Sequence, residues 1–327
     1  MRFLVAVLLA SALAWAQQYK VSGSIPIGGS GGWDYLTADS ESHRLYVSHA
    51  GEVEVIDLES RKPVGKISGM SRIHGIAIAN DLSTGFISDG GSNQVVSFDL
   101  KTLAAKSKIA TGTNPDGIVY DPASTRVFAF NGRSHDATVI DAKTGKVDRT
   151  IALSGKPEFP VSDGRGNIYD NIEDKSEIVQ IDSKDLTVKA HWPVAPCESP
   201  SGLAIDTRNR RLFAVCDNKI MAVVDADSGK VVATPAIGEG PDAAAFDPGT
   251  QLAFSSNGEG TLTVVAQNGK DSYAAAQTVP TAKGARTMAL DAATHTIYLS
   301  TAKFGPSNGT SRPSILPGTF NVLVVSR

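Results

Sequence analysis

Seven copies of one sequence pattern, spaced 41 to 44 residues apart, dominate this chain of 327 residues. Each copy begins with a short apolar run that ends in Asp or Asn, at Asp39, Asn80, Asp121, Asp163, Asp206, Asp247 and Asp291. A second run such as RLYVS or RVFAF and a third such as VEVID or ATVID follow in the same order. Recurrence at this period indicates a repeat architecture, in which each copy forms one structural unit.

The runs predict strands, because they are rich in β-branched and aromatic residues and are separated by turn residues. Helical HEAT-like repeats have a similar length, but the period-2 patterning argues against them. A fourth run completes six units, and the seventh such run precedes the first unit, at residues 19–27. We therefore predict an all-β fold, a seven-bladed β-propeller with four-stranded blades, whose N-terminal strand closes the last blade.

The first unit contains a motif of a known repeat family. Tyr46-Val47-Ser48-His49, followed by VEVID, resembles the YVTN β-propeller repeat of exported bacterial proteins that are YncE-like. The similarity extends over essentially the whole chain after the N-terminal segment. The resemblance implies the propeller fold and a role in binding or at the cell envelope. It does not name a ligand, since propellers of one fold have many unrelated functions.

The first 16 residues have the pattern of a secretory signal peptide. Arg2 precedes an apolar run at residues 3–13, and Ala14-Trp15-Ala16 forms an A-x-A cleavage site. The run is shorter than the roughly 18 apolar residues that suggest a transmembrane helix. We expect a single propeller domain at residues 17–327, without a transmembrane anchor, in the periplasm or secreted.

The chain has two cysteines, Cys197 and Cys216, and both map to the fifth unit. An oxidising compartment permits a disulfide bond between them, which is the pairing that we expect. Two free thiols or a soft-metal site are the alternatives. The sequence has no C-x-x-C or C-x-x-C-H motif, which argues against structural zinc and covalently attached haem.

One residue in each unit begins the innermost strand, at the face of the propeller that we call the top. Because these residues occupy one repeat position, the ring should gather them at the mouth of the central channel. We refer to them as the mouth ring and expect them to bind a ligand; they are Asp34, His74, Asp116, Glu158, Ser201, Asp242 and Arg286.

Four members of the mouth ring have side chains that suit a divalent cation: Asp34, His74, Asp116 and Glu158. Crowded carboxylates also repel one another, which raises their pKa values unless a cation or Arg286 compensates. An alternative is that the acidic residues only close turns, accepting hydrogen bonds from nearby backbone N–H groups. The sequence leaves both interpretations open.

The last unit contains an insertion at residues 301–320, between its second and third strands. Such a loop lies on the top face, where long loops often form lids or binding segments. Lys303, Phe304 and Arg312 can meet an anionic or aromatic ligand there. The alternative is an irregular surface loop without a role in binding.

The sequence contains none of the catalytic motifs G-x-S-x-G, H-E-x-x-H or a phosphate loop. With 31 basic and 34 acidic residues the net charge is −3, so nucleic acid is not an expected partner. We expect a monomeric, non-catalytic protein that binds a small ligand, a cation or an envelope protein at the channel mouth. The alternative is a metal-dependent, lactonase-like hydrolase that uses the acidic residues and His74. A quinone-dependent oxidoreductase is a third option.

Overall fold

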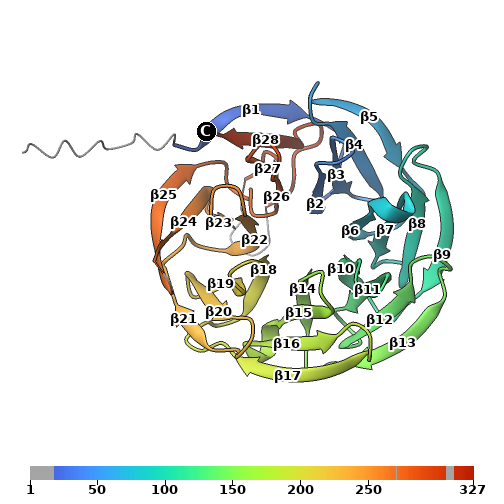
Figure 1. The fold of residues 1–327 in the computed structure, drawn as a ribbon. Helices are drawn as coiled ribbons and strands as arrows, with labels where there is room; N and C mark the ends of the chain where they lie inside the picture. Colours follow the sequence, from blue (N-terminus) through green and yellow to red (C-terminus); the bar gives the residue numbers. More distant parts are fainter. Residues whose placement is uncertain (1–17, 270, 307–312) are drawn as a thin grey trace, which may run out of the picture.

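Seven four-stranded antiparallel sheets stand around a central axis in the computed structural model (Figure 1). The structure describes residues 18–269, 271–306 and 313–327, so the expected signal peptide lies outside the described residues. The described residues contain no α-helix, only the short 3₁₀ turns η1 (Asn80–Leu82) and η2 (Glu173–Lys175). None of the described segments is a helix of the length and apolarity that crossing a membrane requires. The predicted all-β, seven-bladed propeller is confirmed.

Each blade contains four strands that run outwards from the axis. The innermost strands are β2 (Trp33–Asp39), β6 (Ile73–Ala79), β10 (Pro115–Asp121), β14 (Pro157–Ser162), β18 (Pro200–Asp206), β22 (Pro241–Asp247) and β26 (Met288–Asp291). The second strands are β3 (Arg44–His49), β7 (Thr84–Asp89), β11 (Arg126–Asn131), β15 (Asn167–Ile172), β19 (Arg211–Cys216), β23 (Leu252–Asn257) and β27 (Thr296–Thr301).

The two outer strands of each blade complete the sheets. The third strands are β4 (Glu52–Asp57), β8 (Gln94–Asp99), β12 (Asp136–Asp141), β16 (Glu177–Asp182), β20 (Ile220–Asp225), β24 (Thr261–Gly269) and β28 (Asn321–Ser326). The outermost strands are β5 (Lys62–Ile67), β9 (Ala105–Ala110), β13 (Val147–Ala152), β17 (Thr187–Pro193), β21 (Val231–Ala233), β25 (Ser272–Pro280) and β1 (Lys20–Pro26).

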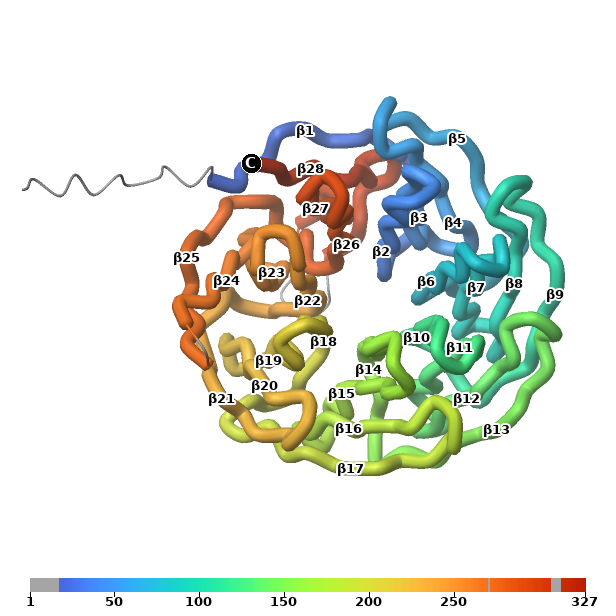
Figure 2. Tube along the Cα trace, viewed as in Figure 1, coloured from blue at the N-terminus to red at the C-terminus, as the bar shows by residue number. Residues whose placement is uncertain are grey.

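The N-terminal strand closes the ring, as the sequence predicts. β1 pairs with β28 in the sheet order β1-β28-β27-β26, and the two strands lie side by side in Figure 2. Ile25 is paired with Val322, and Lys20 is paired with Ser326 near the other end of the strand. The closure pairs the N-terminal strand with the C-terminal strand, so the last blade has four strands like the other six.

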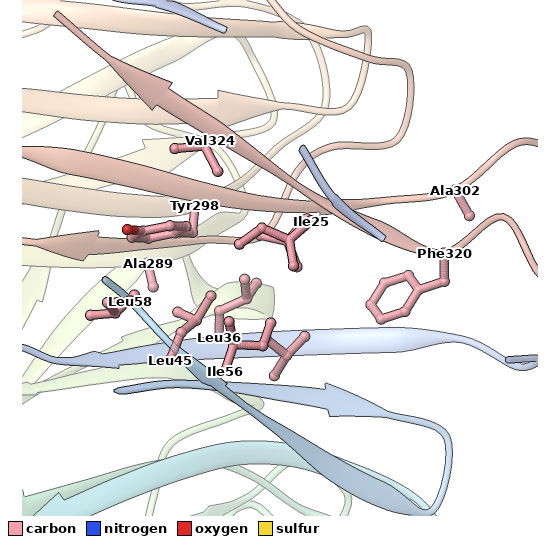
Figure 3. Close-up of a cluster of buried hydrophobic side chains, with 12 residues drawn as sticks. Ile25, Leu36, Leu45, Ile56, Leu58, Ala289, Tyr298, Ala302, Phe320 and Val324 are labelled. Carbon is pink, nitrogen blue, oxygen red and sulfur yellow. The ribbon is translucent and has the colours of Figure 1, made fainter. Parts of the chain in front are cut away.

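The core consists of side chains that are packed between adjacent blades. At the junction of the last and first blades, Ile25, Leu36 and Leu45 form one cluster with Tyr298 and Val324 (Figure 3). Leu45 is fully buried, and Ile25 is only 1% exposed. Burying a side chain of this size contributes about 1.5–3 kcal/mol to folding. The closure strand therefore belongs to the core and is not an accessory segment.

The aspartates that end the innermost strands have structural roles. Asp39 accepts hydrogen bonds from the backbone N–H groups of Glu41 and Ser42, at 3.1 and 3.4 Å. The same Asx-turn pattern occurs at Asp121, Asp206, Asp247 and Asp291. These side chains satisfy turn donors on the face opposite the mouth ring, which explains their recurrence without a binding role.

Candidate functional site

The innermost strands are irregular where they begin. On β2, Trp33 pairs with His49, and the next regular pair is Leu36 with Val47. Between these two pairs, β2 contains one residue more than β3. Register shifts occur at the same place in β6, β10, β14, β18 and β22. Asp34 lies within the irregular stretch. Bulges of this kind re-aim side chains, and here the irregularity accompanies the residues of the mouth ring.

All seven residues of the mouth ring line one cavity of about 450 Å³, which we call the channel pocket. Lys303, which the sequence analysis expects to meet a ligand on the top face, does not line this cavity. Its side chain is exposed, and its backbone bonds to Thr319 within the insertion. Arg312 lies outside the described residues. The shared repeat position thus brings the seven mouth-ring residues to one cavity, and Lys303 of the insertion is not among the residues that line it.

Asp34, His74 and Asp116 form a tight group inside the channel pocket. The Nδ1 atom of His74 lies 2.5 Å from Oδ2 of Asp34 and 3.5 Å from Oδ1 of Asp116. One potential ligand atom from each of the three lies within 4.8 Å of the others. The His74 side chain is only 4% exposed, so packing fixes the orientation of its ring. Glu158, the fourth expected metal ligand, is not part of this group.

The surroundings of His74 favour its charged form. Burial lowers the pKa of His74, but the hydrogen bond to Asp34 and the negative charges of Asp116 and Asp34 outweigh this effect. The net result is a pKa above the usual value for histidine. A positive charge at this point, whether a proton on His74 or a cation, is therefore stabilised by two carboxylates.

Three acidic residues of the mouth ring are difficult to ionise, namely Asp116, Glu158 and Asp242. Burial raises the pKa of Asp116 and of Glu158, and the mutual repulsion of negative charges adds to it. Burial also raises the pKa of Asp242 to about 7, although Arg286 lies 3.3 Å away and opposes the shift. The channel pocket therefore crowds carboxyl groups whose charged forms its own cations stabilise only in part.

Lys156 explains why Glu158 is separated from the group around His74. The Lys156 ammonium forms ion pairs with both Glu158 and Glu173, and these partners raise the pKa of the lysine despite its burial. Glu158 is thereby bound to an internal cation. The lysine is a lining residue that the sequence analysis missed.

A pair of stacked aromatic residues from opposite sides of the ring lies next to the mouth ring. The sequence analysis did not identify this pair. Tyr35 of the first blade stacks on Phe159 of the fourth blade with ring centroids 5.1 Å apart. The Tyr35 hydroxyl donates a hydrogen bond to the Glu158 carbonyl oxygen at 3.1 Å. The signal was present in the sequence, because the residues that directly follow the other mouth-ring positions are small: Gly75, Gly117, Gly202, Ala243 and Thr287.

Polar residues near the ends of the second strands attach the mouth ring to neighbouring blades. Ser88 donates a hydrogen bond to the carbonyl oxygen of Asp116 at 2.6 Å, and Asn171 donates one to that of Ser201 at 2.8 Å. Ser256 bonds in the same way to the carbonyl oxygen of Arg286. These donors share one repeat position, which is the signal that could have identified them. They hold the backbone that carries the pocket side chains.

The turn interpretation of the acidic mouth-ring residues does not fit the geometry. Among the residues that the structure describes, no backbone N–H group donates a hydrogen bond to the carboxylate of Asp34, Asp116 or Asp242. Their partners are instead His74 and Arg286. The carboxylates therefore face the channel pocket and one another.

Cys197 and Cys216 form a disulfide bond at the top of the fifth blade, with Cα atoms 5.5 Å apart. Both residues are buried, and Cys216 ends β19 opposite Pro200 of the innermost strand. The bond connects the loop that enters β18 to the neighbouring strand. It therefore anchors the segment that presents Ser201 to the channel pocket.

Comparison with known proteins identifies the fold alone. No family model matches the sequence, and no curated protein matches it. Hydrazine synthase from Kuenenia stuttgartiensis is similar in structure, with a TM-score of 0.72, 16% identity, and coverage of 83% of this chain and 92% of that one. U3-55K has a TM-score of 0.77 at 8% identity, over 92% of this chain and 97% of that one.

The WD40 repeats of RRP9 superpose with a TM-score of 0.80 at 8% identity, and the match covers 94% of this chain and 99% of that one. Such low identities between similar structures establish a shared β-propeller and no shared function. The fold is compatible with a scaffold that binds a ligand or a protein.

Proposed function

We propose that this chain is a non-catalytic binding protein whose channel pocket holds a divalent cation through Asp34, His74 and Asp116. The observation that carries this proposal is the convergence of two carboxylate oxygens and one imidazole nitrogen within 4.8 Å, from three successive blades. Carboxylate and imidazole together suit first-row transition cations such as Mn²⁺ and Zn²⁺. Ca²⁺ takes six to eight oxygen ligands, which this set does not provide.

The charge distribution of the channel pocket supports the same proposal. Lys156 is paired with Glu158 and Glu173, and Arg286 is paired with Asp242. The group around His74 has no lysine or arginine as a direct partner among the described residues, and only a proton on His74 opposes its two carboxylates. A bound divalent cation would provide the missing positive charge and displace the proton that His74 and Asp34 share.

Metal analysis of mildly purified protein tests this function. We expect one divalent cation per chain, or stoichiometric binding of Mn²⁺ or Zn²⁺ by the chelated protein in calorimetry, with Ca²⁺ binding much more weakly. Absence of both would overturn the proposal. The lactonase-like alternative gains no support from the structural comparisons; turnover of esters or lactones by the metal-loaded protein would replace binding with catalysis.

We also propose that the protein is exported after removal of residues 1–16, and that it is a monomer related to the YVTN-repeat propellers. The A-x-A pattern at Ala14 and Ala16 supports export, and the motif at Tyr46–His49 supports the relationship. Sequencing of the mature N-terminus in cell fractions tests the first point. A mature chain that begins at Gln17 in the periplasm or medium is expected, and retention of Met1 in the cytoplasm would contradict it.

A further inference from the structure

A second pocket adjoins the channel pocket and has a different chemistry. It has a volume of about 510 Å³ and shares Gly240, Arg286 and Thr287 with the channel pocket. We call it the apolar pocket, because four large apolar side chains line it: Trp33, Phe304, Pro313 and Ile315. Cavities of this size accommodate small organic molecules.

Trp33 and Phe304 form the aromatic part of the apolar pocket. Their ring centroids are 6.1 Å apart, and Trp33 also stacks on the buried Phe320 at 5.3 Å. The Phe304 ring lies so close to Gly284 that a Cβ atom there would come within 2.7 Å of it. Gly284 has a φ of 79°, a conformation that favours glycine. The absence of a side chain at Gly284 thus leaves the space that the Phe304 ring occupies.

Two cations border these aromatic rings. Lys283 is exposed and forms no ion pair with any residue that the structure describes. Arg286 is paired with Asp242 through its Nε atom, and its terminal nitrogens donate no hydrogen bond to described residues. No acidic residue is among the described residues that line the apolar pocket. An anionic group is therefore the complementary partner for this end of the pocket.

We propose that the apolar pocket binds a small apolar carboxylate. The apolar body packs against Trp33 and Phe304, and the carboxylate accepts hydrogen bonds from the terminal nitrogens of Arg286. The planar guanidinium matches a carboxylate in two-point geometry, and Lys283 adds a second positive charge. This site is separate from the cation site, since none of the three proposed metal ligands lines it.

Calorimetric titration of the full chain with 3-phenylpropionate tests this site, together with the NMR signal of the Trp33 indole N–H. We expect stoichiometric binding that shifts this signal. The uncharged 3-phenylpropanamide should bind at least tenfold more weakly, because it lacks the charge that Arg286 and Lys283 recognise. Acetate, which lacks the apolar body, should not shift the Trp33 signal.

Variants separate the parts of the site. Arg286→Gln and Phe304→Ser should each weaken 3-phenylpropionate binding at least tenfold. Lys283→Gln, an exposed change that cannot disturb the core, should weaken it severalfold. Lys143→Gln is the matched control, since Lys143 is also exposed and lies on the opposite face; it should leave binding unchanged.

Three results would overturn the proposal: equal affinity for the acid and the amide, unchanged binding in the Lys283 and Phe304 variants, or no shift of the Trp33 signal. Concentration-dependent dimerisation that Phe304→Ser abolishes, without carboxylate binding, would instead assign the pocket to a second copy of this chain. Mn²⁺ binding is titrated separately. Intact cation binding with no carboxylate binding would contradict this inference and leave the proposed function standing.

Discussion

The Nδ1 atom of His74 lies 2.5 Å from a carboxylate oxygen of Asp34, although the two residues are 40 positions apart in the chain. Asp34 lies on β2 and His74 on β6, the innermost strands of successive blades. The next blade adds Asp116 at 3.5 Å from the same nitrogen. The sevenfold arrangement therefore converts one repeat position into a cluster of side chains, and this cluster can be tested residue by residue.

Removal of one carboxylate charge should weaken cation binding. Asp34→Asn and Asp116→Asn preserve side-chain size but remove a metal ligand that is strongly preferred when charged. We expect each variant to bind Mn²⁺ or Zn²⁺ at least tenfold more weakly in calorimetry, and the double variant to bind neither. Circular dichroism spectra should match the unaltered protein, since these residues lie at the pocket and not in the apolar core.

Asp217→Asn is the matched control for this experiment. Asp217 lines the same channel pocket but is not in the group of three potential ligands. The variant should retain nearly the affinity of the unaltered protein. An equal loss in all three single variants would show that the pocket attracts cations only through its overall charge, which contradicts a defined coordination site.

Asp242 should make the protein less stable as the pH rises. Its pKa is raised to about 7 by burial, with Arg286 opposing the shift and three acidic neighbours adding to it: Asp34, Asp116 and Glu173. The folded protein thus keeps a proton that the unfolded chain has already lost above its ordinary pKa of 3.8. Stability is therefore lost as the pH rises from 3.8 through about 7.

Asp242→Asn should remove this loss. Relative to the unaltered protein, we expect the variant to raise the Tm by a few degrees at about pH 8 and by clearly less at about pH 5, where folded Asp242 still holds its proton and only part of the stability has been lost. Thermal unfolding at both pH values measures the difference. An equal effect at the two pH values would indicate a change in packing and not the removal of a titrating group.

The architecture could be predicted from the sequence because every strand recurs seven times with the same order of runs. The position of the mouth ring followed from the same repetition. Contacts between different repeat positions could not be obtained in this way. The pairing of Lys156 with Glu158 and the stacking of Tyr35 on Phe159 depend on side chains that differ from blade to blade.

Of the four predicted metal ligands, the repeat places all in one ring, but only three of them form the group around His74. The repeat places Glu158 in the same ring as Asp34, but it does not show that a lysine two residues earlier in the chain takes this carboxylate as a partner. Lys303 lies in an insertion that has no counterpart in the other units, so symmetry gives no position for it. Where the chain departs from the repeat, the position and the partners of a side chain depend on its local contacts.

The disulfide bond of the fifth blade should contribute to stability. Cys197 and Cys216 are 19 residues apart, and a loop of this size gives about 3 kcal/mol on the chain-entropy estimate. We expect the double variant Cys197→Ser/Cys216→Ser to have a Tm several degrees lower in thermal unfolding. Reducing agent should lower the Tm of the unaltered protein similarly and leave that of the double variant unchanged. An unchanged Tm on reduction, after loss of the bond is verified by thiol titration, would contradict this contribution.

Closure of the ring by β1 should be visible in the energetics of single side chains. Ile25 is 1% exposed and packs with Leu36 and Tyr298, so Ile25→Ala should lower the free energy of unfolding by about 2–5 kcal/mol. Val21 lies on the same strand but is 39% exposed, and Val21→Ala should change stability by no more than about 0.5 kcal/mol. Urea denaturation of both variants measures the contrast. Because both substitutions truncate a β-branched residue of the same strand, equal and small effects would mean that β1 is not essential to the closed ring. A large effect at Ile25 alone would show that the first strand of the chain completes the core of its last blade.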